Sequence, residues 1–121
     1  MFCSIYVFRV SKGNLDAFID AQREAATLFQ DHGSLEDATF VALDTSAKYG
    51  CEPFDQALTA TDEEAVIVVG LDRFEDRETY ERAMKGITED DRFQRLDEIV
   101  GEALGDAAGL ALRGEFERVI G

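Results

Sequence analysis

The sequence predicts one α+β domain, with a four-stranded antiparallel sheet and helices on one face of that sheet. A chain of 121 residues has the usual length of a single domain, and 45% hydrophobic residues are enough to fill its core. Four segments are rich in β-branched and aromatic residues, and three others repeat apolar residues at helical spacing. We therefore expect one domain over residues 1–121.

The first half of the chain predicts a strand, a helix and a second strand. Residues 2–10 (FCSIYVFRV) are β-branched and aromatic, and a polar turn follows them. From Leu15 to Phe29 the apolar residues are spaced by three and four, which places one apolar stripe along a helix. We expect Asn14 to cap the start of this helix and Gly33 to end it. Residues 35–44 (LEDATFVALD) predict the second strand.

The second half predicts a strand, two helices and a last strand. Residues 45–64 contain the only Pro together with Gly, Thr and Asp, and predict a long loop or an irregular hairpin arm. Residues 65–74 (AVIVVGLDRF) predict the third strand. Residues 75–87 and 92–104 predict two amphipathic helices, and residues 110–120 predict a strand with apolar even positions. This order of elements is that of a ferredoxin-like split βαβ sandwich.

The first and third predicted strands are apolar on both faces. In residues 2–10 both the even positions, such as Phe8, and the odd positions, such as Val7, are apolar, and residues 65–74 repeat this pattern. One chain has too few helices to cover both faces of the sheet, so we expect a second copy over the open face, as in a dimeric α/β barrel. The alternative is that the arm at residues 45–64 folds back over the sheet.

The chain is strongly acidic, with a formal net charge of −14. Such a charge disfavours nucleic acid and anionic membranes as partners, because both need a positive protein surface. No apolar run is long enough to cross a bilayer, and residues 1–10 lack the features of a signal peptide, so we expect a cytoplasmic protein. An acidic surface with only three Lys is typical of a halophilic host, and ordinary acidity is the alternative.

Several kinds of chemistry lack the residues that they need. The sequence contains no Gly-rich dinucleotide motif, no phosphate-binding loop and no nucleophile elbow. One His and two separated Cys do not make a zinc or iron site, and the acidic pairs at residues 63–64 and 90–91 are more typical of solvated surface than of a cation site. We therefore expect no cofactor and no metal, and we expect Cys3 and Cys51 to be free thiols.

Four residues are candidates for a site. His32 is the only imidazole and the natural proton-transfer group, although a His in the last turn of a helix often faces only the helix dipole and water. Tyr6 is either a core tyrosine or a hydroxyl donor to a ligand. Glu36 could orient His32 or be solvated, and Arg113 could line a cavity or an exposed edge. The catalytic candidates are His32 and Tyr6, and the ligand-binding candidates are Tyr6, Glu36 and Arg113.

Two classes of function remain open. The first is a protein that binds a small apolar or aromatic molecule between the sheets without chemistry. The second is a cofactor-independent monooxygenase or isomerase that acts on a small aromatic substrate. A ferredoxin-like RNA-binding protein is excluded by the charge and by the lack of an aromatic and basic motif in the third strand. The fold alone does not choose between the first two.

The order and spacing of several segments resemble a known family. These segments are KGNLDAF, DHGSLE, FDQALTATDEE, EDDRF and RGEFERVI, and the most specific are residues 32–36 (HGSLE) and 54–57 (FDQA). The chain is similar over nearly its whole length to the DUF1428 family of uncharacterised bacterial proteins. The resemblance implies a small dimeric α/β barrel related in shape to antibiotic-biosynthesis monooxygenases, and it implies no particular reaction. The chain departs from the family pattern in its first strand, at Asp91 and at Arg113.

Overall fold

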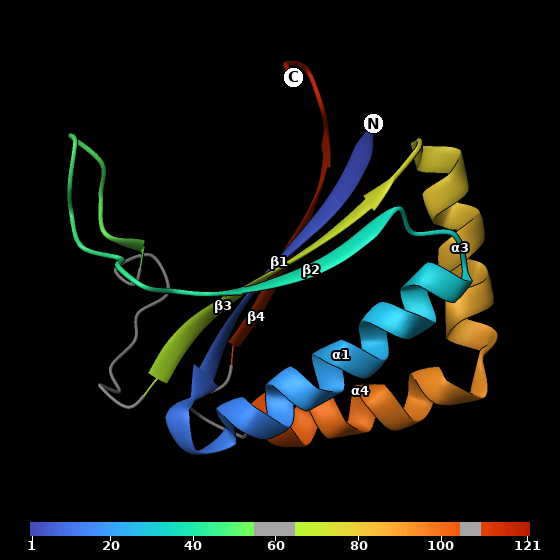
Figure 1. Ribbon diagram of the computed structural model, residues 1–121, viewed down its shortest axis with the longest axis horizontal. Coiled ribbons are helices and arrows are strands. Elements are labelled where there is room, and N and C mark those ends of the chain that lie inside the picture. Colours follow the sequence, from blue (N-terminus) through green and yellow to red (C-terminus); the bar gives the residue numbers. More distant parts are fainter. Residues whose placement is uncertain (55–64, 105–109) are drawn as a thin grey trace.

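The structure is a computed structural model that describes residues 1–54, 65–104 and 110–121 (Figure 1). It confirms an α+β fold with one four-stranded antiparallel sheet. The elements in chain order are β1 (Phe2–Ser11), the 3-10 turn η1 (Lys12–Asn14), α1 (Leu15–Asp31), β2 (Glu36–Val41), β3 (Ala65–Phe74), α3 (Arg77–Glu89), α4 (Asp91–Leu104) and β4 (Leu110–Glu117).

The strand order in the sheet is β2-β3-β1-β4, with every neighbouring pair antiparallel. The two apolar strands, β1 and β3, therefore occupy the centre, where each has a neighbour on both sides. Helices α1, α3 and α4 lie on one side of the sheet, and α1 runs beside α4 (Figure 1). The opposite face carries no helix of the described residues.

The ends of the elements differ in places from the prediction. The side chain of Asn14 makes no capping hydrogen bond, because residues 12–14 form a 3-10 turn that leads directly into α1. Gly33 does end α1 with a φ of 104°, a conformation that residues with a Cβ rarely adopt. Helix α3 begins two residues later than predicted, where the Asp76 carboxylate accepts a hydrogen bond of 2.7 Å from the backbone N–H of Thr79. Strands β2 and β4 are shorter than predicted at their carboxyl ends.

The core under the helices is divided into two clusters. One cluster joins the Phe2 end of β1 and the Phe74 end of β3 to α1, α3 and α4. The other surrounds Phe18 of α1 at the opposite ends of the same two strands, where Val68 is also completely buried. Between the two clusters, the inward-facing positions of the central strands carry small or polar residues rather than large apolar ones.

The face of the sheet away from the helices is apolar at its centre. Ile5, Val7 and Val69 are half-buried at its centre, whereas Phe40, Leu112 and Phe116 remain about half exposed, at 55%, 47% and 51%. Residues 42–54 follow β2 and rise on this side of the molecule (Figure 1). Phe40, Leu112 and Phe116 stay partly exposed beside this described part of the predicted arm, whereas Ile67 on the same face is buried, and residues 55–64 lie outside the described residues.

Candidate functional site

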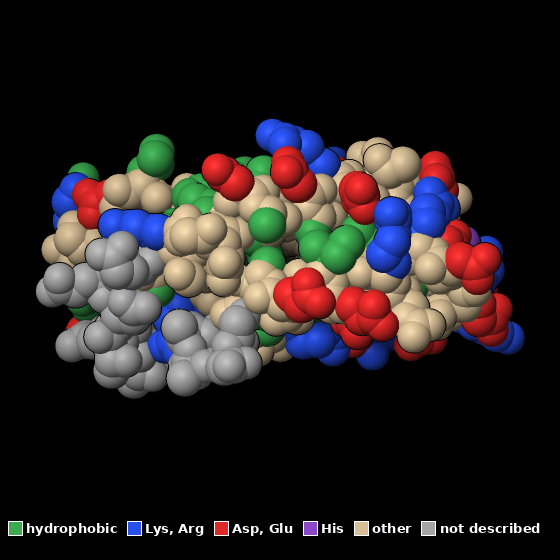
Figure 2. Space-filling view, turned by 90° about the horizontal axis from the view of Figure 1, so that it is seen from below, with side chains coloured by type: hydrophobic (Ala, Val, Ile, Leu, Met, Phe, Trp, Pro, Cys, Tyr) green, Lys and Arg blue, Asp and Glu red, His purple; other side chains and the backbone are tan. Residues whose placement is uncertain are grey.

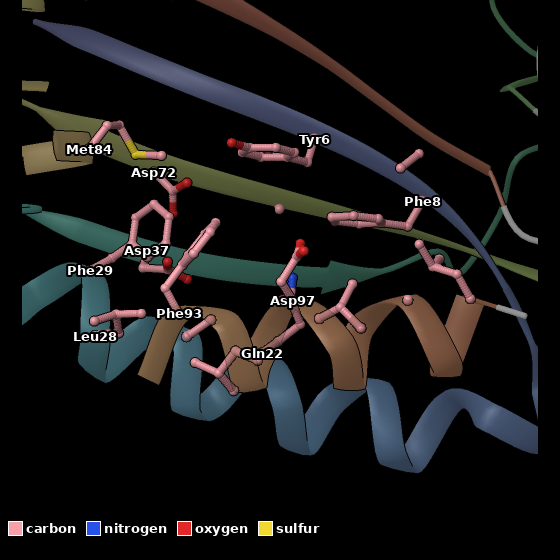
Figure 3. Close-up of a pocket in the computed structure, with 17 residues that line it drawn as sticks. Tyr6, Phe8, Gln22, Leu28, Phe29, Asp37, Asp72, Met84, Phe93 and Asp97 are labelled. Atoms are coloured by element: carbon pink, nitrogen blue, oxygen red, sulfur yellow. The ribbon is translucent and has the colours of Figure 1, made fainter. Parts of the chain in front are cut away.

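A pocket of about 480 Å³ lies between the inner face of the sheet and helices α1 and α4 (Figure 3). Its walls are mostly apolar, and their aromatic members are Tyr6, Phe8, Phe29 and Phe93. The exposed lining residues are Asp97 and Gly101 of α4 and Ala111 of β4, so the pocket opens between these two elements. The ligand site predicted from the sequence lies between the sheets of two subunits. This pocket instead lies between the sheet and the helices of one chain.

The pocket exists because the strands place small or polar residues between the two core clusters. One row across the sheet consists of Asp37, Asp72, Ser4 and Glu115, each paired with the next in the strand register. The adjacent row includes Gly70 beside Tyr6. Gly70 has no side chain to fill the space, and a Cβ at this position would meet only ordinary contacts of 3.6–3.8 Å. The helices rest on the large apolar residues at both ends and leave a gap over these rows.

Asp72 and Asp37 form a carboxyl pair in the wall of the pocket. Asp72 is only 5% exposed, and its Oδ2 accepts a hydrogen bond of 3.2 Å from the Ser4 hydroxyl. Burial, followed by the hydrogen bond and the negative charge of Asp37, raises the pKa of Asp72 to about 9. Burial also raises the pKa of Asp37, and the hydrogen bond with Asp72 opposes that shift. Asp72 is therefore a neutral carboxylic acid at neutral pH.

Tyr6 and Arg113 lie directly opposite each other in the register of β1 and β4, on the inner face of the sheet. The guanidinium carbon of Arg113 is 5.9 Å from the centre of the Tyr6 ring, which also stacks on Phe8. In Figure 3 the hydroxyl end of Tyr6 points toward the side of the pocket where Asp72 lies. Tyr6 thus lines the pocket, and Arg113 lies behind its ring rather than among the lining residues.

Arg113 is held by two neighbours. Its Nη2 donates hydrogen bonds of 2.9 Å to the hydroxyl of Tyr80 and to Oε2 of Glu115. The Glu115 carboxylate and then the Tyr6 hydroxyl raise the pKa of Arg113 above its ordinary range. Burial raises the pKa of Tyr80, although the Arg113 charge opposes this shift. The Arg113 charge is therefore compensated within the sheet.

His32 lies at the junction of the helices and outside the pocket lining. Its Nε2 is 3.0 Å from Oδ2 of Asp90, which also accepts hydrogen bonds from Arg92. Arg92 donates in turn to Asp31 at the end of α1. The Arg92 guanidinium and then His32 hold the pKa of Asp90 well below its usual range. This cluster joins the end of α1 to the start of α4.

Glu36 lies on the opposite face of the sheet from Tyr6. It is paired with Arg73 in the β2–β3 register, and the two side chains form an ion pair on the open face. The structure therefore brings Tyr6 and Arg113 together, and it places His32 at a helix junction and Glu36 on the far face. The four candidate residues do not converge on one site.

Asp37 and Asp72 were not among the site residues predicted from the sequence. The available signal was parity, because Asp72 occupies an even position of a strand whose even positions Val66, Val68 and Phe74 are apolar. An acidic residue at such a position points into the core and marks a buried polar site. Asp37 could be placed beside it only through the register of β2 and β3, which the sequence does not state.

The described residues contain no group of three or more potential metal ligands, and Cys3 and Cys51 are free thiols. None of the described helices combines the length and the hydrophobicity that a membrane span requires. Of the family-like segments, residues 32–36 lie at the end of α1 and the start of β2, whereas residues 55–57 lie outside the described part of the chain.

The fold is similar to that of solved proteins of low sequence identity. Two are dimeric ferredoxin-like proteins from an uncultured marine organism. The first is 13% identical, with a TM-score of 0.64 over 99% of this chain and 96% of that one. The second is 11% identical, with a TM-score of 0.66 over 100% and 97% of the two chains. A third is SnoaB, a cofactor-independent oxygenase from Streptomyces nogalater, which is 10% identical with a TM-score of 0.55 over 99% and 95%.

The TM-scores establish that these proteins share a fold with this chain. Identities this low do not show that they share an activity. No curated protein matches the sequence. The family described as a protein of unknown function, DUF1428, matches residues 1–101, which include every described element except the end of α4 and strand β4. The chain belongs to the DUF1428 family.

Proposed function

We propose that this protein is a homodimer that binds a small, uncharged, largely aromatic molecule in the pocket between its sheet and helices. The observation that carries the proposal is the apolar pocket of about 480 Å³ with a neutral carboxylic acid in its wall. Ligand sites are typically apolar cavities with a few polar groups that fix orientation. The aromatic side chains supply the apolar surface here, and Asp72 supplies the polar group.

The charges around the pocket favour a neutral ligand. Among the described residues its lining includes Asp37, Asp72 and Asp97 but no Lys or Arg. The Asp72 carboxyl can donate a hydrogen bond to a carbonyl or phenol oxygen, and the Asp37 carboxylate can accept one from a hydroxyl. An anionic ligand would meet negative charge in a poorly solvated space, which is unfavourable. A phenol or an aryl ketone satisfies these donors and acceptors.

The homodimer is supported by the open face of the sheet. Phe40, Leu112 and Phe116 form an apolar surface around the half-buried centre of β1 and β3, and such surfaces usually mark an interface. Two of the similar solved proteins are dimeric. A second copy that places its own sheet on this face would bury it, and each pocket would remain within its own subunit.

Binding of 1-naphthol, a neutral aromatic hydroxyl compound, tests the proposal. Isothermal titration calorimetry should detect binding by the wild-type protein, with one site per chain. Gly70→Leu places a side chain in the pocket and should abolish binding, whereas Thr27→Leu adds a similar side chain to the exposed surface of α1 and should leave it unchanged. If the wild-type protein does not bind 1-naphthol, the pocket is rejected as the site. It is also rejected if the Gly70→Leu variant melts cooperatively and binds as well as the wild type.

The second candidate is an enzyme that needs no cofactor. The carboxyl pair in the pocket favours it, because two acids of different pKa can give and take a proton. A cofactor-independent monooxygenase would consume oxygen when given 1-naphthol or a related phenol, and an oxygen electrode would detect this. An isomerase would consume no oxygen.

A further inference from the structure

We infer that Asp37 and Asp72 are a catalytic proton-transfer pair that enolises a small aryl ketone bound in the pocket. The inference deepens the proposed function and rests on it, because the ketone has to occupy the same pocket as the proposed ligand. It assigns a reaction to two residues that lie side by side in adjacent strands and face the same cavity.

The geometry separates the two carboxyl groups into different surroundings. Asp37 is half-buried on β2, which is an edge strand, whereas Asp72 is buried on the central strand β3 beside the Ser4 hydroxyl. Both carboxyl groups border the space enclosed by Phe29, Phe93 and Met84 (Figure 3). A ketone held against these apolar side chains can therefore be reached by both members of the pair.

The reaction needs no group from outside the pocket except the ketone. The Asp37 carboxylate takes a proton from the carbon next to the carbonyl, and the electrons of that C–H bond form a carbon–carbon double bond. The carbonyl π electrons then take the proton of the Asp72 carboxyl, which gives the enol, a protonated Asp37 and an ionised Asp72. Return of a proton to carbon and loss of the enol proton to Asp72 restore both residues. Nothing is oxidised or reduced.

The other titratable groups near the pair do not replace it. Tyr6 and Asp97 also line the pocket, and Asp97 is exposed on α4 at the opening. Glu115 lies beyond Ser4 in the same row and is hydrogen-bonded to Arg113. Burial raises the pKa of both carboxyl groups, and more for Asp72 than for Asp37, where the hydrogen bond with Asp72 opposes the shift; the more buried Asp72 is therefore the acid of the pair and Asp37 its base.

The test is deuterium exchange into 1-tetralone, an uncharged aryl ketone with exchangeable hydrogens on the carbon next to its carbonyl. Proton NMR in D2O measures how fast these hydrogens are replaced. The wild-type protein should accelerate exchange over buffer by about 10²-fold or more, which is the usual contribution of general acid–base catalysis. Asp37→Asn and Asp72→Asn should each remove most of this acceleration. Asp91→Asn, an exposed change at the start of α4 and outside the pocket, should not.

The pH dependence distinguishes chemistry from a structural effect. Enzyme-dependent exchange should rise as Asp37 ionises and fall above about pH 9 as Asp72 loses its proton. Thermal melting of each variant identifies loss of folding, and Asp37→Asn, at the less buried position, keeps the test valid if Asp72→Asn does not fold. Binding of 1-naphthol without any accelerated exchange would overturn the inference and leave the proposed function standing. If neither compound binds, both are wrong.

Discussion

Asp37 and Asp72 lie directly opposite each other in the β2–β3 register, on the face of the sheet that the helices cover. Two carboxylates this close in a poorly solvated space repel each other, so one of them keeps its proton. The more buried member, Asp72, is the one whose pKa rises to about 9. This arrangement has a cost in stability that depends on pH.

Asp72→Asn should make the protein less sensitive to rising pH. Asp72 loses its proton near the ordinary aspartate pKa of 3.8 when the chain is unfolded, whereas burial raises its pKa to about 9 when the chain is folded. Between these values the folded state holds the extra proton, so the free energy of unfolding falls as pH rises, by up to about 1.4 kcal/mol per pH unit. Urea unfolding of the wild type and the variant from pH 5 to 8.5 measures the difference.

The free energy of unfolding of the variant should rise steadily relative to that of the wild type over this pH range, because an amide cannot ionise. Effects of acidic residues away from the pair cancel in the comparison, since both proteins contain them, whereas the pKa of Asp37 also changes because Asp37 is hydrogen-bonded to Asp72. Two unfolding curves that stay parallel from pH 5 to 8.5 would show that Asp72 has an ordinary pKa.

Gly86→Ala should destabilise the protein, although Ala is the better helix former by about 1 kcal/mol. A Cβ at Gly86 of α3 would lie 2.7 Å from Nδ1 of His32, which is too close, and would push the ring away from Asp90. Removing the ring by His32→Ala should reverse the sign, so that Gly86→Ala then stabilises the protein. Chemical denaturation of the single and double variants measures this coupling.

Gly101→Ala provides the matched control, because a Cβ there has no neighbour within 4 Å and Gly101 also lies within a helix. It should stabilise the protein by up to about 1 kcal/mol. Equal effects of the two Gly→Ala changes would contradict the role assigned to the His32 ring.

Leu112→Glu should separate the proposed homodimer. Leu112 lies on the open face of β4 and is 47% exposed in one chain, so a partner sheet would bury the new charge without a counterion. Light scattering at micromolar concentration should give twice the chain mass for the wild type and the chain mass for the variant. Gln94→Glu adds the same charge to the exposed surface of α4 and should remain dimeric. A monomeric wild type would rule out the dimer directly.

Potassium chloride should raise the melting temperature between low and molar concentration. The chain carries a net charge of −14, and Figure 2 shows acidic side chains on both sides of a strip of hydrophobic ones on the face formed by α1 and α4. Salt at 1 M reduces the screening length to about 3 Å and so weakens their repulsion. Scanning calorimetry would measure the shift, and a melting temperature that is flat or falls with salt would argue for ordinary acidity.

The sheet and helices could be predicted from the sequence because local patterns determine them. The β-branched run at residues 65–74 and the stripe from Leu15 to Phe29 each depend on neighbours along the chain. The start of α1 at Leu15 was predicted correctly, but the 3-10 turn at residues 12–14 was not, because such a turn competes with a capping side chain and no simple pattern distinguishes the two.

The candidate site was harder to predict from the sequence, because it depends on the pairing between strands. Tyr6 and Arg113 are far apart in sequence and meet only through the β1–β4 register, and the same holds for Asp37 and Asp72 across β2 and β3. His32 and Glu36, by contrast, are close in sequence but are separated by the turn at Gly33, which sends the chain from a helix end into a strand. Proximity along the chain was therefore a poor guide to proximity in space.

Because the core is divided, the residues that hold the sheet to the helices are different from most of those that line the pocket. Phe2 and Phe74 at one end, and Phe18 and Val68 at the other, bury the apolar surface that holds the sheet to the helices. Apart from Tyr6, the rows between them bury little apolar surface, so isosteric changes of Ser4, Asp37 or Asp72 alter hydrogen bonding more than packing. Substitutions in these middle rows can therefore reshape the pocket while both ends of the core stay the same.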